Sequence, residues 1–306
     1  MIDTAFTKEH QPVSDLAVVQ RAAMVPIKDR RLAFGGPYED ILSAIFLHRG
    51  IESLDELATG AKDLLHFNQL NGIQAAVELL FTGLQSQQKI VIIGDFDADG
   101  ATSTALCMLA LRDLGFNSVQ YLVPNRFDFG YGLSPEIVDV AIEQYSPDIL
   151  LTVDNGIACH AGVAHAKAHG LKVIITDHHL PGESLPNADA IVNPNQHYCE
   201  FGSKHLAGVG VAFYVLSAFK THLLSVGWFP DPARAPNLAQ YLDIVALGTV
   251  ADVVKLDKNN RIFVYQGVQR IRARRCRPGI RALLDVASKA PDKVTATDLG
   301  FILGPR

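Results

Sequence analysis

The stretch KIVIIGDFDADG, residues 89–100, decides the fold of this chain. Its first half contains the β-branched run Ile90–Ile93, which predicts a short strand buried on both faces. Three aspartates, Asp95, Asp97 and Asp99, follow within five residues. Because carboxylates this close repel one another strongly, the segment is costly unless a cation neutralises it. The stretch therefore predicts a buried strand that ends in a cation site.

Two other interpretations apply to the same residues. A solvated acidic turn is the usual explanation of an isolated Asp-x-Asp, but the position at a strand end favours a metal site. A glycine-rich dinucleotide loop between Gly94 and Gly100 is excluded on chemistry, because a pyrophosphate at a helix N-terminus needs amide donors rather than carboxylates. We expect Asp97 and Asp99 to point to one side of a loop that leaves the sheet, where their oxygens suit Mg²⁺ or Mn²⁺.

Strands and helices alternate downstream of this stretch. Further strands are expected at 119–123, 149–153, 172–175 and 191–193, and helices at 102–114, 135–144 and 162–169. Ser134 is a candidate N-cap of the second of these helices. The rhythm predicts an α/β fold with a mostly parallel sheet covered by helices. In such sheets, ligands bind at the carboxyl ends of the strands.

Helical segments are expected to flank this sheet. The predicted organisation is an N-terminal helical segment at 1–85, a metal-binding catalytic domain at 86–255 and a helical connection at 256–306. Further helices are expected at 209–224, 238–251, 263–271 and 280–287. The last ten residues do not resemble a frayed terminus, so we expect the sequence to be the N-terminal portion of a longer protein.

Composition narrows the class of protein. Hydrophobic residues make up 48% of the chain, enough for a sizeable core. The net charge of −5 argues against a generally basic nucleic-acid-binding surface but allows a local basic track. Apolar runs of membrane-spanning length and a secretory signal are both missing from the sequence. The four cysteines are widely scattered, which predicts reduced thiols in a cytoplasmic protein.

Two further predicted strands also end in metal-binding side chains. Asp154 follows one of them, and Asp177, His178 and His179 follow the next. Adjacent residues in an extended segment point to opposite sides, so one histidine is expected to bind metal and the other to contact phosphate. For Asp154 alone, a helix N-cap is an equal alternative. Asp252, after an apolar helical run, is a weak candidate by itself.

The order Asp-x-Asp, Asp, Asp-His-His, Asp resembles the DHH phosphoesterases, a family named after the motif found here at 177–179. The resemblance extends from about residue 42 to 306. Within that family, four blocks are similar to the RecJ group of bacterial single-strand-specific 5′-to-3′ DNA exonucleases, namely 94–103, 123–134, 206–212 and 248–254.

This resemblance implies a set of roles. The implied ligands of two Mn²⁺ or Mg²⁺ ions are Asp97, Asp99, Asp154 (as the bridge), His178 and Asp252. His179 is implied to contact the scissile phosphate, and Asp177 to support the histidines. The implied activity is release of 5′-mononucleotides from single-stranded DNA in repair and recombination, with a helicase or a single-strand-binding protein as possible partner.

The sequence departs from the family pattern in two ways. Many relatives have a histidine where this chain has Ile93, which predicts fewer ligands for one metal. RecJ proteins also continue into further DNA-binding domains. The DNA contacts expected within this chain are Arg126 and, from a cluster of arginines at 270–281, Arg275 and Arg277. A solvated helix end is an equal interpretation of that cluster.

Two alternatives to the exonuclease remain open at this point. A DHH phosphodiesterase for short oligonucleotides, cyclic dinucleotides or pyrophosphate would use the same metal ligands. An inactive truncated fragment, or a binding module without turnover, would retain them without hydrolysis.

Overall fold

The computed structural model describes residues 31–125 and 130–306, and the chain divides into two compact units, Met1–Leu57 and Ala58–Arg306. The described part of the first unit contains helix α1 (Glu39–His48). The amide of Leu32 donates to the buried hydroxyl of Ser43 at 2.8 Å, which ties the preceding segment to the helix. All the residues predicted to bind metal lie in the second unit.

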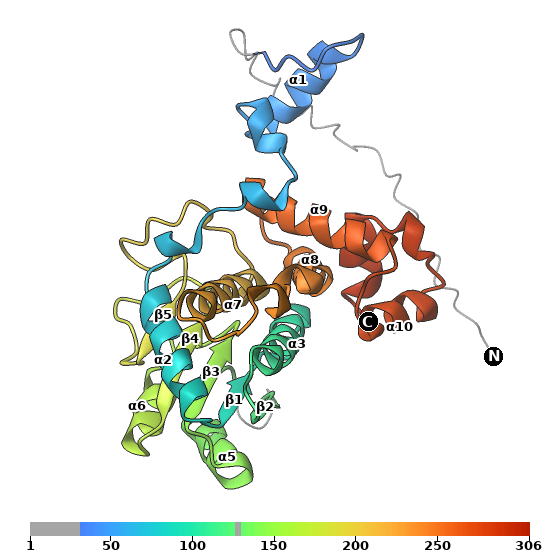
Figure 1. The fold of residues 1–306 in the computed structure, drawn as a ribbon. Coiled ribbons are helices and arrows are strands. Elements are labelled where there is room, and N and C mark those ends of the chain that lie inside the picture. The colour runs from blue at the N-terminus through green and yellow to red at the C-terminus, as the bar shows by residue number, and fades with distance from the viewer. Residues whose placement is uncertain (1–30, 126–129) are drawn as a thin grey trace, which may run out of the picture. The chain divides into compact units, whose positions relative to one another are not determined.

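A five-stranded parallel sheet forms the centre of the second unit, as predicted (Figure 1). Its strands are β1 (Ile90–Ile93), β2 (Val119–Leu122), β3 (Ile149–Val153), β4 (Lys172–Thr176) and β5 (Ala190–Val192). They are ordered β2-β1-β3-β4-β5, and every neighbouring pair is parallel. The α/β prediction is therefore confirmed, and the strands lie close to their expected bounds.

Helices cover both faces of this sheet. They are α2 (Ile73–Gln85), α3 (Ala98–Asp113), α5 (Pro135–Tyr145), α6 (His160–Ala168) and α7 (Gly208–Ser225). Ile90 and Ile92 pack with α2, α3 and α7, whereas Val91 and Ile93 pack with α5 and α6. This alternation is the two-residue period of a strand, and it explains why β1 is apolar at every position. Each such buried side chain contributes about 1.5–3 kcal/mol.

Helix α7 lies at the centre of the larger core. It is long and apolar enough to cross a membrane by length and composition alone, but 67% of it is buried within the fold. Helices α2, α3 and α8 (Leu242–Ala251) pack against it, which explains its apolar composition. It is therefore a core helix of the second unit.

Several helical predictions need correction. The predicted helix 238–251 is a 3₁₀ turn (Leu238–Tyr241) followed by α8. The segment 51–72, predicted helical, forms only short 3₁₀ turns, and Gly72 adopts a φ of 77° immediately before α2. The remaining helices are α9 (Lys258–Arg272), α10 (Pro278–Val286) and a short α11 (Ala296–Asp298). The predicted N-cap Ser134 is confirmed, since its side chain accepts from the amide of Ile137. The domain boundaries at 85 and 255 stay predictions.

The strand order places a crevice beside β1. The chain runs from β1 to β2 on one side of β1, and then crosses to β3 on the other side. The direction of the strand order therefore reverses between β1 and β3. Ligands of open α/β sheets bind at such a reversal, outside the carboxyl ends of the strands. The segments 94–97 and 154–156 emerge there, one from each of the two strands.

Candidate metal centre

The first turn of α3 begins the centre, and it corrects the expected loop. Asp97 is the N-cap of α3, with Oδ1 accepting from the amide of Gly100 at 2.9 Å, and Asp99 lies inside the first turn. Gly100 is required here, because a Cβ would lie 2.4 Å from the carbonyl oxygen of Asp95. The two carboxylates therefore reach the strand ends from a helix N-terminus rather than from a loop.

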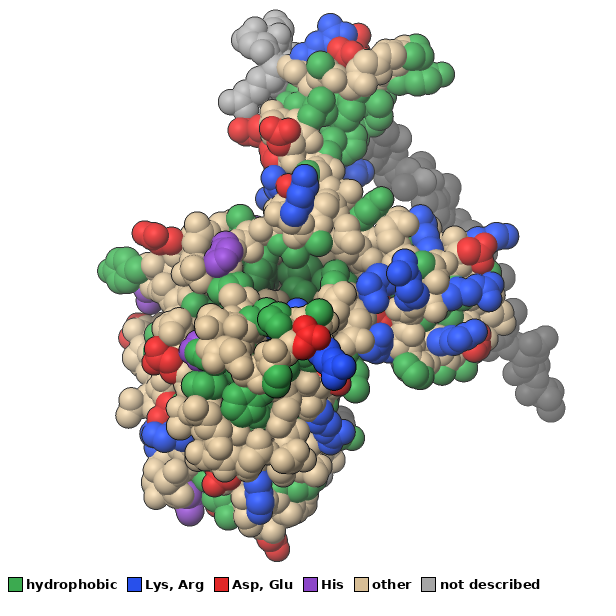
Figure 2. Space-filling view, in the orientation of Figure 1, with side chains coloured by type: hydrophobic (Ala, Val, Ile, Leu, Met, Phe, Trp, Pro, Cys, Tyr) green, Lys and Arg blue, Asp and Glu red, His purple; other side chains and the backbone are tan. Residues whose placement is uncertain are grey.

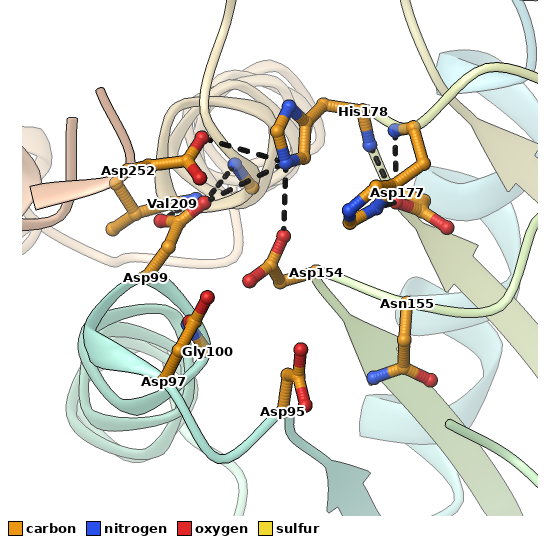
Figure 3. Close-up of polar contacts among 12 residues, drawn as sticks. Asp95, Asp97, Asp99, Gly100, Asp154, Asn155, Asp177, His178, Val209 and Asp252 are labelled. Atoms are coloured by element: carbon orange, nitrogen blue, oxygen red, sulfur yellow. Dashed lines mark hydrogen bonds and ion pairs between the residues drawn. The ribbon is translucent and has the colours of Figure 1, made fainter. Parts of the chain in front are cut away.

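Asp99 is fixed by the N-terminus of a second helix. Its Oδ2 accepts from the amide of Gly208 at 2.5 Å and its Oδ1 from that of Val209 at 2.9 Å, the first two residues of α7 (Figure 3). The side chain is fully buried. A carboxylate is favoured at a helix N-terminus, where amides lack intrahelical partners and the dipole is positive. The hydrogen bond between Asp99 and the amide of Gly208 thus joins α3 to α7 at the centre.

Asp154 follows β3 in a left-handed conformation, with φ 62°. It is not a helix cap, because the N-cap of α6 is Cys159. Gly208 packs directly on it, and a Cβ at that glycine would lie 2.6 Å from the Cβ of Asp154. A positive φ in a residue other than glycine costs about 1–3 kcal/mol, a cost found mainly at functional sites.

His178 faces three carboxylates at once. Its Nε2 lies 3.1 Å from Oδ1 of Asp154, 3.5 Å from Oδ2 of Asp252 and 3.9 Å from Oδ2 of Asp99 (Figure 3). Asp252 reaches the centre from the C-cap of α8. A negative charge is disfavoured at that end of a helix. A cation between these groups would satisfy them together, whereas one ring nitrogen cannot.

Asp177 holds the histidine pair. Its Oδ1 accepts from the amides of His178 and His179 and from Nδ1 of His179 at 2.7 Å, and its Oδ2 accepts from the amide of Ile157. Burial alone would raise the pKa of Asp177, but these hydrogen bonds outweigh it and lower that pKa. The bond to Asp177 raises the pKa of His179 to about 9. The ring of His179 is therefore oriented with Nε2 left for another partner.

Two asparagines, which the sequence analysis missed, fix the same segment from the far side. The side-chain amide of Asn193 donates to the carbonyl of His179 at 2.9 Å, and that of Asn195 to the carbonyl of His178 at 2.6 Å. Both lie beyond β5, so nothing in the local sequence connects them to the histidines. They limit the backbone freedom of the two imidazoles.

Three overlapping groups of side chains have ligand atoms within 4.8 Å of one another. They are Asp95 with Asp97 and Asp154, Asp99 with His178 and Asp252, and Asp154 with His178 and His179. Asp154 and His178 each belong to two groups. These two residues therefore join the three groups into one cluster of candidate ligands. Asp95 was missed as a ligand candidate, although the spacing Asp-x-Asp-x-Asp could have suggested it.

The electrostatics of the centre favour a bound cation. Burial, with repulsion from Asp154 and Asp252, raises the pKa of Asp99 well above its usual range. Burial, with repulsion from Asp97 and Asp252, raises the pKa of Asp154 to about 9. Burial also raises the pKa of Asp252. Like charges in a buried site disfavour joint ionisation, and a divalent ion removes that penalty.

Unsatisfied polar atoms support the same conclusion. Within 31–125 and 130–306, the buried Oδ1 of Asp154, Nε2 of His178 and Oδ2 of Asp252 have no hydrogen-bond partner. Buried polar atoms are rarely left unpaired, and an ion is one accepted explanation. Oxygen donors with one imidazole fit Mn²⁺ or Mg²⁺.

The predicted DNA contacts are not all brought to this centre. Arg126 lies outside the described residues. Arg277 lies 5.2 Å from the ring centroid of Tyr241, and its Nε is 3.8 Å from the buried Asp243. Arg275 is exposed. Figure 2 shows a gathering of Lys and Arg side chains over the region of α9 and α10. The contacts of these three arginines with DNA stay predictions.

An apolar cavity of about 640 Å³ joins the two regions. Its lining includes Phe96 and Asp97, residues of α3, α8 and α10, and the side chains of Arg277 and Arg306. Phe96 is about half exposed beside the acidic centre. The cavity thus connects a cation site to two guanidinium groups.

Comparison with known proteins decides the family. The model of the DHH family, N-terminal domain, matches residues 89–249, just over half of the chain. The chain belongs to the DHH family. The matched region of this DHH chain contains the whole sheet and each side chain of the centre except Asp252.

The similar proteins are much longer than this DHH chain. It is 56% identical to the single-stranded-DNA-specific exonuclease RecJ of Salmonella typhimurium, over 87% of this chain and 46% of that protein. It is 54% identical to RecJ of Haemophilus influenzae, over 92% of this chain and 49% of that protein. The crystal structure of RecJ in complex with Mn²⁺ from Thermus thermophilus matches with a TM-score of 0.69 and 32% identity, over 85% of this chain and 35% of that one. The chain therefore spans about half the length of the curated relatives it matches.

Proposed function

We propose that this chain carries the catalytic part of a metal-dependent exonuclease that removes 5′-mononucleotides from single-stranded DNA, in repair and recombination. The observation that carries the proposal is the centre at the β1–β3 reversal, where Oδ1 of Asp154, Nε2 of His178 and Oδ2 of Asp252 are buried without a hydrogen-bond partner among the described residues. The identity to RecJ proteins, named single-stranded-DNA-specific exonucleases, supports the choice of substrate.

The metal ligands proposed are Asp97, Asp99, Asp154, His178 and Asp252, with Asp95 added from the geometry. Two Mn²⁺ or Mg²⁺ ions, when bound, supply an acidified water and offset the charge that develops on the phosphate. A complex of a RecJ relative with Mn²⁺ supports that choice of ion. Asp154, which belongs to two of the three groups, would contribute to both ions. Asp99 is held by the amides of Gly208 and Val209, and His178 by Asp177 and Asn195.

His179 is proposed as the phosphate contact. Its Nδ1 is held by Asp177, so Nε2 is the nitrogen available to an incoming oxygen. The pKa of about 9 keeps the ring protonated at neutral pH, which suits a phosphate oxygen. The ring of Tyr131 meets it edge-on at 6.1 Å, and the Tyr131 hydroxyl donates to the carbonyl of Asp154. Asp177 acts as a positioning residue.

The DNA contacts around the centre, the location in the cell and the class of partner are also proposals. The apolar cavity beside Asp97 and Phe96 is wide enough for an unstacked base, and Arg277 in its lining supplies positive charge for the strand. All four cysteines are free thiols, which fits the cytoplasm. A helicase or single-strand-binding protein that exposes 5′-ended strands is the class of partner that this activity requires.

Digestion of a 5′-labelled single strand tests the proposal. Wild-type chain with Mn²⁺ should release labelled mononucleotide, and an equal duplex should stay intact. Asp154→Ala should remove the activity, whereas the exposed Asp292→Ala should leave it unchanged. Undiminished digestion by Asp154→Ala would reject the assignment. A strong preference for a dinucleotide over the long strand would favour an oligonucleotide phosphodiesterase instead.

A further inference from the structure

A second group of metal-binding side chains lies on the two helices of the smaller core. One carboxylate oxygen of Asp139, on α5, and one ring nitrogen each of His165 and His169 lie within 4.8 Å of one another. His165 is in the last turn of α6 and His169 is its C-cap. We propose that these three residues form a surface site for a late first-row transition ion such as Zn²⁺, separate from the acidic centre.

The spacing on the helix suits a shared ion. His165 and His169 are four residues apart, so their side chains lie one above the other on the same face. Their ring centroids are 4.5 Å apart. Two histidines at this spacing on a helix are a known arrangement for zinc ligands. Asp139 completes the group from the neighbouring helix, since α5 and α6 pack side by side.

One ring is already oriented for a metal. Nδ1 of His169 lies 2.9 Å from the carbonyl oxygen of His165. A carbonyl only accepts hydrogen bonds, so Nδ1 carries the proton and Nε2 presents a lone pair. Metal-binding histidines commonly donate their second nitrogen to a carbonyl or carboxylate in this way. The backbone of α6 therefore selects the tautomer that can bind an ion.

A simple ion pair explains only part of the group. Oδ1 of Asp139 lies 2.7 Å from Nε2 of His165, and the two side chains are 62% and 31% exposed. A surface pair of this kind contributes little stability by itself. It gives no role to His169, one ring nitrogen of which lies within 4.8 Å of the ligand atoms of the other two residues.

The ligand types distinguish this group from the acidic centre. Two imidazoles and one carboxylate favour Zn²⁺, Cu²⁺ or Ni²⁺, whereas a carboxylate-rich centre favours Mn²⁺ or Mg²⁺. An ion here would fasten α5 to α6. Each of these helices follows a segment at the acidic centre: Tyr131 precedes α5, and Asp154 precedes α6. The proposed ion would thus stabilise the frame of the centre from the opposite end of α6.

Equilibrium dialysis against Zn²⁺, followed by metal analysis of the protein, tests the site. His169→Ala removes one ligand and leaves the Asp139–His165 pair intact. His160→Ala, an exposed histidine of the same helix outside the group, is the matched control. Zinc held at the acidic centre contributes equally to all three proteins. Wild type and His160→Ala should each bind one more Zn²⁺ per chain than His169→Ala. In His169→Ala, the affinity of this site for Zn²⁺ should be reduced at least about tenfold. Equal zinc content in the three proteins would overturn the proposal.

Thermal unfolding supplies an independent measurement. With EDTA, wild type and His169→Ala should unfold at the same temperature, because no packing is lost at an exposed ring. With Zn²⁺, the melting temperature of wild type and of His160→Ala should rise more than that of His169→Ala. An identical rise in all three would show an ion pair without a metal site. Neither measurement depends on nuclease activity.

Discussion

The acidic centre and the arginine-rich segment 270–281 both concentrate like charge, but they differ in what faces that charge. At the centre, the carboxylates of Asp99, Asp154 and Asp252 share a single imidazole, that of His178. In the arginine segment, Arg277 is paired with the buried Asp243, and Nε of Arg272 donates to the carbonyl of Val294. A dense run of like charge therefore indicates function only where the fold places too few opposite charges beside it.

The charges of the two regions also differ in their effect on folding stability. Repulsion and burial raise the pKa values of Asp99 and Asp154, so the metal-free centre opposes folding near neutral pH. The pair Arg277–Asp243 supports packing between α8 and the start of α10 instead. Replacing charges in the two regions should thus change activity and stability in opposite ways.

The largest effect is expected from Asp154→Asn. Turnover of single-stranded DNA should fall by at least about 10²–10³-fold, because charge stabilisation at the reacting phosphate is lost. Without metal, the variant should unfold at a higher temperature than wild type, because one repelling carboxylate is gone. Activity assays and melting in EDTA check both. Asp292→Asn is the exposed control, and a variant that loses stability in EDTA would contradict the comparison.

A smaller loss is expected from Asp177→Asn. The amide oxygen can still accept from the two backbone amides and from Nδ1 of His179, but the negative charge beside that ring is gone and the amide of Ile157 loses its acceptor. Metal affinity or activity should fall about 10–100-fold, as for other groups that orient ligands. The pH–rate profile should also change, since the pKa of His179 would fall toward its ordinary value. An unaltered profile with wild-type activity would remove Asp177 from a positioning role.

The pH dependence of stability gives a third prediction. A carboxyl whose folded pKa is raised stabilises the protein at low pH, and this contribution is lost as pH rises. For Asp154, this contribution to stability is lost as the pH rises from about 3.8, the ordinary pKa of the carboxyl, to about 9, its raised pKa in the folded protein. Between pH 5 and 8, metal-free wild type should therefore lose stability relative to Asp154→Asn, and saturating Mn²⁺ should reverse the trend. Denaturant titrations of both proteins at several pH values measure this; parallel pH curves would contradict it.

The smallest effects are expected in the arginine segment. Arg275→Ala should weaken single-strand binding a few-fold, lower the salt-dependence slope by about 0.7, and leave the melting temperature unchanged. Arg277→Ala should lower the free energy of unfolding by about 0.5–1.5 kcal/mol, because the guanidinium charge beside the buried Asp243 is removed while the backbone amide of residue 277 still donates to that carboxylate. Binding at several salt concentrations and melting separate the two. Unchanged stability of Arg277→Ala, or a lower melting temperature of Arg275→Ala, would contradict this prediction.

Local patterns are enough to predict the strands and most of the centre. The central strands are apolar runs, and parallel strand ends must meet, so Asp154 and Asp177–His179 are placed correctly beside the first motif. The bonds that orient these residues could not be predicted. Asp99 is held by amides 109 and 110 positions away, and His178 by Asn195, contacts that only the folded topology creates.

The other differences between the predictions and the structure also have identifiable causes. Asp97 was expected in a loop, yet its side chain caps α3, so that the helix begins at Ala98 rather than at residue 102. Asp95 was passed over because the resemblance supplied only two aspartates from that motif. The group on α5 and α6 was missed because Asp139 and His165 are 26 residues apart. Helix packing, rather than any motif, brings them together.

Manganese stoichiometry tests the central claim most directly. Titration of the metal-free chain with Mn²⁺, followed by electron paramagnetic resonance, counts the bound ions and reports whether they are adjacent. The account predicts two Mn²⁺ per chain with a spin-coupled signal in wild type, and loss of that coupling in Asp154→Asn. A wild-type chain that binds no Mn²⁺, or two uncoupled ions unaffected by Asp154→Asn, would contradict it.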